Sequence, residues 1–355
     1  MSRFFNARIR EIAPYVPGEQ PQDKSYIKLN TNESPLAPSP VVQQALAGFD
    51  AADLRLYPDP DARQLRGAVA KAHGLTEAQV FAGGGSDEVL AYSFMAFFNP
   101  GDRVYFPDIT YGFYQVYADL FGLRAVKVPL RADFTVALED YYNAEGHIFI
   151  ANPNAPTGIC LTPAQIEGLL QQNPNRLVIV DEAYIDFAQE GYTCVPLIEK
   201  YDNLLVTQTF SKSRGLAGIR LGFGFGQPAL LDGLERIKYS FNPYNIDRVS
   251  LCVGIAAAGD SAYLRTAAGS IAATRDKTAA QLRELGFRVL ESQANFLFAE
   301  PPGMSGKDFF LGLKESGILV RYFAKPRIDS FVRITIGLPE EMQKLVEQAK
   351  ILIGK

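Results

Sequence analysis

Cysteine and histidine are scarce in this 355-residue chain. The three cysteines, Cys160, Cys194 and Cys252, are odd in number and far apart, so they predict neither a metal knuckle nor a disulfide framework. The only two histidines, His73 and His147, have no other potential metal ligands clustered around them. We therefore expect no metal site and a structural role for both histidines.

Long apolar runs and an excess of positive charge are also missing. The uncharged stretch 249–259 is much shorter than the roughly 20 residues that a membrane-spanning helix needs. Charged residues interrupt the apolar residues of segment 1–10, which is unlike a secretory signal. The formal net charge is -4, so no basic surface for nucleic acid is indicated. These absences predict a cytoplasmic protein that binds neither membranes nor nucleic acid.

Apolar runs and helical patterns alternate through the middle of the chain. Hydrophobic residues make up 47% of the sequence, enough for a sizeable core, and the length suggests about two domains. The predicted strands are 103–106, 125–128, 147–151, 177–180 and 204–209. Helices are predicted between them at 111–121 and 163–170. This alternation is typical of an α/β fold with a mostly parallel sheet covered by helices.

The flanking regions differ from this middle part. Proline interrupts residues 1–35, which predicts an extended arm. Helical spacing is found at 40–49, 62–73, 89–98 and, in an alanine-rich region, 249–285. The C-terminal part mixes both kinds of element. Strands are expected at 295–299, 319–323 and 331–336, and helices at 307–315 and 340–352. We expect an N-terminal arm (1–35), a large domain (36–245) and a smaller α+β C-terminal domain (246–355).

The stretch from Thr207 to Gly224 contains the strongest chemical signal. Lys212 follows an apolar strand and lies among small residues, and Arg220 comes eight positions later. A lysine that small neighbours leave uncovered can reach a ligand, and lysine forms Schiff bases with carbonyl compounds. The alternative for a lone lysine is a solvated side chain on a turn.

A carboxylate follows a second buried strand. Asp181 comes directly after the apolar run 177–180, at the end where open α/β sheets bind ligands. A carboxylate at a buried strand end needs a cationic or hydrogen-bonding partner. A protonated pyridine nitrogen would meet that need, and Tyr184 could donate a hydrogen bond to a phenolate oxygen on the same ring.

A glycine-rich loop precedes the expected helix at 89–98. Gly83 to Glu88 would present backbone N–H groups and the positive end of a helix dipole to a phosphate. The alternative is an ordinary loop with Ser86 as the helix cap. Glu88 stands where the dinucleotide fingerprint requires its third glycine, and the chain has no Walker-type phosphate loop.

Three motifs together resemble those of one enzyme superfamily. They are Asn-Pro-Asn-Ala-Pro-Thr-Gly at 152–158, Asp-Glu-Ala-Tyr from Asp181, and Ser-Lys-x-x-x-Leu-Ala-Gly-Ile-Arg-x-Gly from Ser211. Their order and separations are similar to those of the fold-type I pyridoxal phosphate aminotransferases, over nearly the whole chain. The resemblance implies a mostly parallel sheet of the seven-stranded type and pyridoxal 5′-phosphate as the cofactor.

Further motifs resemble the histidinol-phosphate aminotransferase family within that superfamily. They are Asn30-Thr-Asn-Glu-Ser-Pro, Tyr57-Pro-Asp, Gly85-Ser-Asp-Glu, Thr110-Tyr-Gly-Phe-Tyr, Asn242-Pro-Tyr-Asn, Val320-Arg-Tyr-Phe and Phe331-Val-Arg-Ile-Thr-Ile-Gly. The implied reaction converts L-histidinol phosphate and 2-oxoglutarate into imidazole acetol phosphate and L-glutamate. An aromatic aminotransferase or a threonine-phosphate decarboxylase of the same branch remains the alternative. A non-catalytic cofactor-binding regulator is a more distant one.

The resemblance also implies roles for individual residues. Lys212 forms the Schiff base with the cofactor, Asp181 pairs with its ring nitrogen, Tyr184 bonds its 3′-oxygen and Tyr111 stacks on its ring. The cofactor phosphate is surrounded by Ser86, Asp87, Ser211, Arg220 and, from the neighbouring subunit of a homodimer, Tyr57.

Substrate recognition is assigned in the same way to Tyr15, Asn32, Arg321 and Arg333. Histidinol phosphate has no carboxylate, so its phosphate would occupy the basic pocket. For Arg321 the alternative is a surface ion pair. The sequence departs from the family at Ala155, where an asparagine usually donates to the 3′-oxygen. Either Asn154 takes its place or Tyr184 makes this bond alone.

Overall fold

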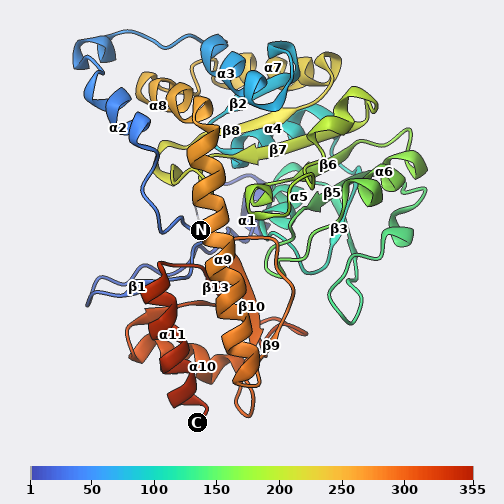
Figure 1. The fold of residues 1–355 in the computed structure, drawn as a ribbon. Helices are drawn as coiled ribbons and strands as arrows, with labels where there is room; N and C mark the ends of the chain where they lie inside the picture. Colours follow the sequence, from blue (N-terminus) through green and yellow to red (C-terminus); the bar gives the residue numbers. More distant parts are fainter. Residues whose placement is uncertain (1, 355) are drawn as a thin grey trace.

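A seven-stranded sheet with helices on both faces forms the larger part of the fold (Figure 1). The computed structural model describes residues 2–354. The strands lie in the order β2 (Val80–Gly83), β8 (Gly222–Phe225), β7 (Leu204–Thr209), β6 (Val178–Asp181), β5 (His147–Ala151), β3 (Arg103–Pro107) and β4 (Arg124–Val128). Strand β8 runs in the opposite direction to the other six strands, which are parallel to one another. The fold class predicted from the sequence is confirmed.

Alternate side chains of the central strands enter two different apolar layers. Phe149, Ile179 and Leu205 pack with residues of α4 (Ser86–Phe97), α5 (Phe113–Phe121) and α7 (Pro228–Phe241). Val178 and Val206 pack on the other face with residues of α3 (Arg63–His73), α6 (Pro163–Gln172) and α8 (Arg248–Gly259). Because strand side chains alternate between faces, apolar residues at every position bury both sides of the sheet.

The strand directions bring the chemically active residues to one edge of the sheet. The carboxyl ends of β5, β6 and β7 meet there, where Asp181 ends β6 and Lys212 follows β7. Strand β8 starts at the same edge because it is antiparallel, and Gly222 pairs with both Thr209 and Gly83. Arg220, just before β8, therefore lies near the start of α4.

The C-terminal part contains an antiparallel sheet with its own core. Its order is β12 (Arg321–Tyr322), β13 (Val332–Thr335), β10 (Phe296–Glu300) and β9 (Arg288–Val289). Helices α10 (Gly306–Glu315) and α11 (Pro339–Leu352) pack there, together with residues 268–282 of the long helix α9 (Ser261–Glu284) (Figure 1). Strand β1 (Ile27–Lys28) of the N-terminal arm pairs with β11 (Ile318–Leu319). The arm is thus joined to the C-terminal part.

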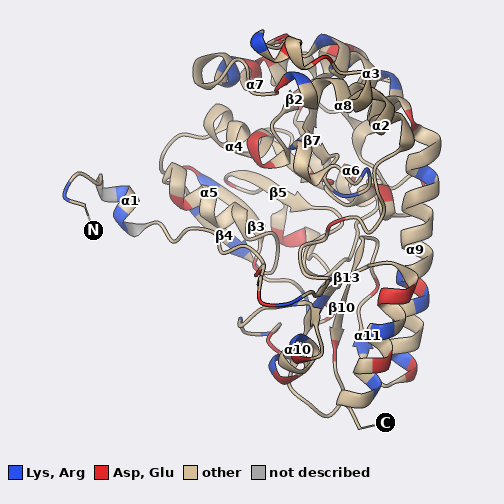
Figure 2. Cartoon of the chain, turned by 90° about the vertical axis from the view of Figure 1, so that its left-hand side faces the viewer, with Lys and Arg blue, Asp and Glu red and all other residues tan. Residues whose placement is uncertain are grey.

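Several elements differ from the sequence expectations. The structure has two strands, β2 and β8, that the sequence patterns do not predict, because β2 has only four residues and β8 alternates glycine with phenylalanine. Helix α7 is a further element outside the expected ones. The arm, expected to be extended, contains the short helix α1 (Ala7–Glu11), which projects from the rest of the chain (Figure 2). Helix α8 lies within the range expected for the C-terminal domain (246–355). It nevertheless packs against α3 and α2 (Pro40–Ala47), which belong to the range expected for the large domain.

No helix within residues 2–354 is long and apolar enough to cross a bilayer. Within the same residues, no group of three or more histidine, cysteine or acidic side chains is arranged to hold a metal ion.

Candidate active site

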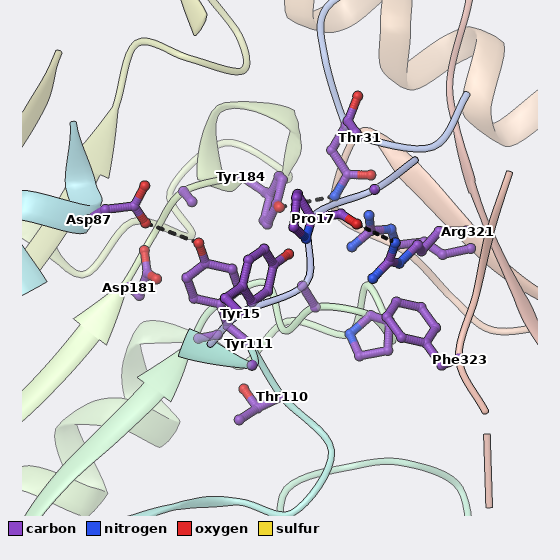
Figure 3. A pocket seen from close by; sticks show the side chains of 18 of the residues that line it. Tyr15, Pro17, Thr31, Asp87, Thr110, Tyr111, Asp181, Tyr184, Arg321 and Phe323 are labelled. Carbon is purple, nitrogen blue, oxygen red and sulfur yellow. Dashed lines mark hydrogen bonds between the residues drawn. The ribbon is translucent and has the colours of Figure 1, made fainter. Parts of the chain in front are cut away.

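A cavity of about 670 Å³ lies between the active edge of the sheet, the N-terminal arm and the C-terminal part. Figure 3 shows Asp87, Tyr111 and Asp181 towards one end and Arg321 and Phe323 towards the other. All the predicted site residues line it except Asn154 and Tyr57. The fold therefore brings together side chains that are up to about 300 residues apart in the sequence.

The Lys212 side chain lines this cavity and makes no ion pair or side-chain hydrogen bond among residues 2–354, although the charges of Asp87 and Glu33 act on it. Its Nζ lies 5.9 Å from the centre of the Tyr184 ring. Burial, reinforced by the positive charge of Arg333, lowers the pKa of Lys212 to about 8. About a tenth of this lysine is consequently a neutral amine at pH 7, far more than for an ordinary lysine, and the neutral amine is the reactive form of the side chain.

Asp181 is a buried carboxylate with only neutral hydrogen-bond donors. Its Oδ2 accepts a 3.0 Å bond from the hydroxyl of Tyr114, and its Oδ1 accepts a 3.2 Å bond from the hydroxyl of Thr207. Burial raises the pKa of Asp181 to about 6, although both hydroxyls oppose the rise. A cation bound beside this carboxylate would lower its pKa and favour the ionised form, because its charge would replace the hydration that burial removes.

Arg220 is held over the glycine-rich loop at the start of α4. It donates to Asp87 Oδ2 at 3.1 Å and to Ser211 Oγ at 3.4 Å. The Tyr111 hydroxyl donates to the other carboxylate oxygen of Asp87 at 3.0 Å. Gly85 has a φ of 92°, a backbone conformation that favours glycine, and a Cβ there would lie 2.6 Å from Nη2 of Arg220 and displace the guanidinium.

The start of α4 offers free backbone donors beside Arg220. The N–H groups of Ser86 and Asp87 have no acceptor among the described residues. Gly222 lies so close that a Cβ there would be 2.1 Å from the nitrogen of Ser86. Helix-start amides, the Ser211 hydroxyl and a guanidinium together suit a dianionic phosphate.

Two arginines face the other part of the cavity. Arg333 donates to the carbonyl of Asn30 at 3.1 Å, while its buried Nε has no partner among the described residues. Arg321 donates to the carbonyls of Pro17 and Val16 at 3.0 and 3.1 Å. It is therefore bonded to the arm and is not a surface ion pair.

The N-terminal arm forms one wall of the cavity. Tyr15 of the arm stacks on Phe113, with ring centroids 4.3 Å apart, and lies beside Tyr111. Its hydroxyl-bearing ring thus lies between the arm and the start of α5, within the cavity lining. Asn32 of the arm also lines the cavity and donates to the hydroxyl of Tyr184 at 3.0 Å.

Two predicted cofactor residues do not reach this cavity. Asn154 donates to the carbonyl of Ile109 and to Thr157 Oγ1, and its amide oxygen accepts from Thr110. These three bonds engage the amide, and Asn154 does not line the cavity, whereas Ala155 does. Tyr57 is 77% exposed and stacks on Tyr244 at the outer surface, outside the cavity.

Sequence reasoning missed the partners that surround Asp181. Tyr114 and Thr207 both belong to stretches that the sequence analysis singled out, but neither was assigned a role. Thr207 sits opposite Asp181 in the β6–β7 pairing, so its position could be derived from strand register. Tyr114 lies on α5, 67 positions away from Asp181, and local pattern gives no signal for that contact.

The fold and this site define a class of enzyme. Residues 24–348 match the model of the family Aminotransferase class I and II, and the chain belongs to that family. It is a pyridoxal phosphate-dependent aminotransferase.

Relatives narrow the family further. The chain is 52% identical over 355 residues to the histidinol-phosphate aminotransferase of Brachyspira hyodysenteriae, covering 99% of both chains. It is 49% identical over 354 residues to that of Clostridium beijerinckii, covering 100% of this chain and 98% of the relative. The crystal structure of histidinol-phosphate aminotransferase from Sinorhizobium meliloti in complex with pyridoxal-5′-phosphate is 25% identical. It covers 99% of this chain and 98% of its own, with a TM-score of 0.90.

Proposed function

We propose that this enzyme transfers the amino group of L-histidinol phosphate to 2-oxoglutarate, producing imidazole acetol phosphate and L-glutamate. The observation that carries the proposal is the shared cavity. A partly neutral lysine, a buried arginine without a carboxylate partner among the described residues, and a buried carboxylate all line one space of about 670 Å³. This set suits an amine that carries a phosphate better than an amine without an anionic group, because the arginine fork matches the oxygens of an anion such as phosphate.

The residues present fit pyridoxal phosphate at each of its polar groups. Ser86, Asp87, Ser211 and Arg220 would hold the phosphate, with Asp87 contributing its backbone N–H and orienting Arg220 and Tyr111. Asp181 would pair with the protonated ring nitrogen, which explains a buried carboxylate that lacks a cation among the described residues. When bound, this cofactor supplies an electron sink for the carbon that loses its proton.

Lys212 would bind the cofactor's carbonyl carbon and act as the general base and acid. Its neutral amine can accept the proton from the substrate carbon, and the resulting ammonium can return it. A pKa of about 8 places Lys212 close to working pH, where neither direction of transfer is strongly disfavoured. The Arg333 charge contributes to this pKa, so the basic pocket also assists the proton transfer.

Arg333 and Arg321 would recognise the phosphate of the substrate. Arg333 lines the cavity and lies over the rings of Phe296 and Phe323 at 5.4 and 5.6 Å, which hold the guanidinium in place. Tyr15 would close the pocket from the arm, which Arg321 anchors through Val16 and Pro17. The arm thus forms one wall of the pocket, while the arginines orient the substrate.

A homodimer would complete the site with Tyr57 of the neighbouring subunit. Leu54, Leu56 and Tyr57 form an exposed apolar surface beside Arg248, whose Nη1 holds the Tyr57 carbonyl at 3.2 Å. Such a patch is typical of a surface that is covered by a partner. A cytoplasmic location remains a prediction from the sequence.

A side-by-side kinetic assay tests the proposal. Histidinol phosphate should show the highest kcat/KM, well above phenylalanine and threonine phosphate, and dephosphorylated histidinol should react poorly. A preference for phenylalanine would indicate an aromatic aminotransferase. Carbon dioxide release from threonine phosphate would indicate the decarboxylase of the same branch.

A further inference from the structure

Tyr184 is connected to a buried polar pair that no role in the reaction explains. Asn32 Nδ2 donates to the Tyr184 hydroxyl at 3.0 Å. The Thr335 hydroxyl donates to Asn32 Oδ1 at 3.0 Å and accepts a bond of the same length from the backbone N–H of Asn32. Asn32 is 1% exposed and Thr335 is 2% exposed. Asn295 Nδ2 binds the carbonyl of Asn32 at 3.1 Å, so the backbone is held as well.

The pair fixes which end of the Asn32 amide faces Tyr184. Because the Thr335 oxygen already accepts the backbone N–H of Asn32, its own proton needs an acceptor, and Asn32 Oδ1 is the one that the structure places there. The amide oxygen therefore faces Thr335 and the NH₂ group faces Tyr184. In the flipped amide, the NH₂ group would face Thr335 and the threonine proton would lose the acceptor that it has here.

This orientation also fixes the direction of the Tyr184 proton. A phenol oxygen that accepts a bond from Asn32 directs its own proton elsewhere, and the side chain of Tyr184 lines the cavity. The ring itself is held by edge-to-face packing on Phe296 at 5.1 Å. The amide therefore decides where the proton points, while the packing decides where the oxygen lies.

We propose that Asn32, oriented by Thr335, is a positioning residue that directs the Tyr184 hydroxyl proton at the phenolic 3′-oxygen of the cofactor. The inference rests on the proposed roles of the site residues. It matters in this chain because Ala155 has no donor to offer and Asn154 is bonded elsewhere, so Tyr184 is left as the side-chain donor for this oxygen. Asn32 acts here through Tyr184, which requires no contact with the substrate.

The readout is the pH midpoint at which the visible absorbance of the cofactor-loaded protein changes, measured without substrate. A donor to the 3′-oxygen stabilises its negative charge and lowers the proton affinity of the bound cofactor. Tyr184→Phe should raise the midpoint by about one pH unit, the size of one hydrogen bond to a charged group. Thr335→Val, which keeps shape but frees the amide, should raise it by a smaller amount, and Thr335→Ser should restore it.

Asn32→Asp gives an independent variant that can keep the left-handed backbone of residue 32 (φ 55°). Its carboxylate only accepts hydrogen bonds, so the Tyr184 proton should turn towards it and the midpoint should rise. The new charge also contributes, and repeating Asn32→Asp in the Tyr184→Phe background measures that part alone. The matched control is Thr278→Val, which removes a buried hydroxyl bonded to the carbonyl of Thr274 in α9 and should leave the midpoint unchanged.

The proposal requires that two changes in the pH midpoint disappear in the Tyr184→Phe background. One is the rise caused by Thr335→Val, and the other is the part of the Asn32→Asp rise that is not due to charge. Equal shifts in both backgrounds would show a packing effect and overturn it. If Tyr184→Phe shifts the midpoint but Thr335→Val and Asn32→Asp do not, the positioning role fails and the proposed function stands. If Tyr184→Phe itself has no effect, the proposed role of Tyr184 fails, and this inference with it.

Discussion

The hydroxyl of Tyr114 donates a 3.0 Å hydrogen bond to Oδ2 of Asp181 inside the apolar layer behind the active site. This bond opposes the burial that raises the pKa of Asp181 to about 6. Without it, the carboxyl should hold its proton to a higher pH and pair less well with a pyridinium nitrogen.

Tyr114→Phe should therefore move the acid limb of the kcat/KM profile upwards by about one pH unit and weaken cofactor binding about tenfold. The pH profile and the cofactor dissociation constant check this expectation. Tyr141→Phe is the matched control, because Tyr141 is equally buried but its hydroxyl has no partner among the described residues. An unchanged profile in Tyr114→Phe would show that the bond has no bearing on Asp181.

Asp181→Asn should stabilise the cofactor-free protein while impairing the enzyme. The folded-state pKa of about 6 lies above the ordinary value of 3.8, so the folded state binds more protons between these pH values. Stability from this group is present below about pH 4 and is lost as pH rises to about 6. Above that pH, Asp181→Asn should raise the free energy of unfolding by about 1–3 kcal/mol.

Urea unfolding of the cofactor-free protein at about pH 8 and about pH 4.5 measures this difference, which should shrink at the lower pH. With pyridoxal phosphate bound, the order should reverse, since the parent then gains its ring-nitrogen partner. If the parent protein without cofactor is more stable than Asp181→Asn at pH 8, the buried Asp181 carboxylate does not destabilise the folded state.

Lys212→Ala should bind pyridoxal phosphate only non-covalently and lose transamination. In the parent protein, the rate of covalent attachment should rise about tenfold per pH unit below the Lys212 pKa of about 8 and level off above it, because the neutral amine reacts. Stopped-flow absorbance gives this profile, and borohydride reduction with peptide mapping identifies the labelled residue. A label on any other lysine would overturn the assignment.

Arg333→Gln should raise the KM for histidinol phosphate about 10- to 100-fold, the loss of one charge-assisted bond, with little change in cofactor affinity. Arg321→Gln should act in the same direction and also loosen the arm that it binds through Val16 and Pro17. Dephosphorylated histidinol is the control substrate, since neither variant should affect its KM strongly. Unchanged histidinol phosphate kinetics in Arg321→Gln would leave Arg321 with a role in the arm alone.

Subunit mixing tests the assignment of Tyr57 to the neighbouring active site. Tyr57→Phe should weaken cofactor binding about 10- to 100-fold, and Lys212→Ala should be inactive. If the site is shared, a hybrid dimer has one doubly damaged site and one intact site, so activity at limiting cofactor should exceed that of either parent. Tyr142→Phe, at another exposed tyrosine, serves as the control. No gain after demonstrated exchange would show that Tyr57 does not complete its neighbour's site.

The main sheet and the placement of Lys212 and Asp181 could be predicted from the sequence. Apolar runs separated by helical patterns produce a mostly parallel sheet, and the carboxyl ends of parallel strands meet at one edge. Residues that directly follow two such strands must therefore lie near one another. The short strands β2 and β8 escaped prediction, since their glycines give little local preference and their pairing depends on contacts far along the chain.

Hydrogen-bond partners were decided only by the tertiary structure. Asn154 and Asn32 are both asparagines in motifs near the site, yet Asn154 turns to Ile109 and Thr157 while Asn32 turns to Tyr184. Nothing in either local sequence distinguishes them. Which groups each amide binds depends on the donors and acceptors that folding brings within hydrogen-bond distance, and these come from other parts of the chain.

The sequence by itself determined which side chains are available at the active edge of the sheet, since the order of strands and loops sets that. The packing of the arm and the C-terminal part against the edge decided what each side chain binds. Thr335 and Asn32 are hydrogen-bonded although they are 303 positions apart in the sequence, and no local sequence pattern predicts such a contact. Local periodicity specifies strands and helices, whereas the direction of a buried proton depends on every donor and acceptor that folding brings within reach.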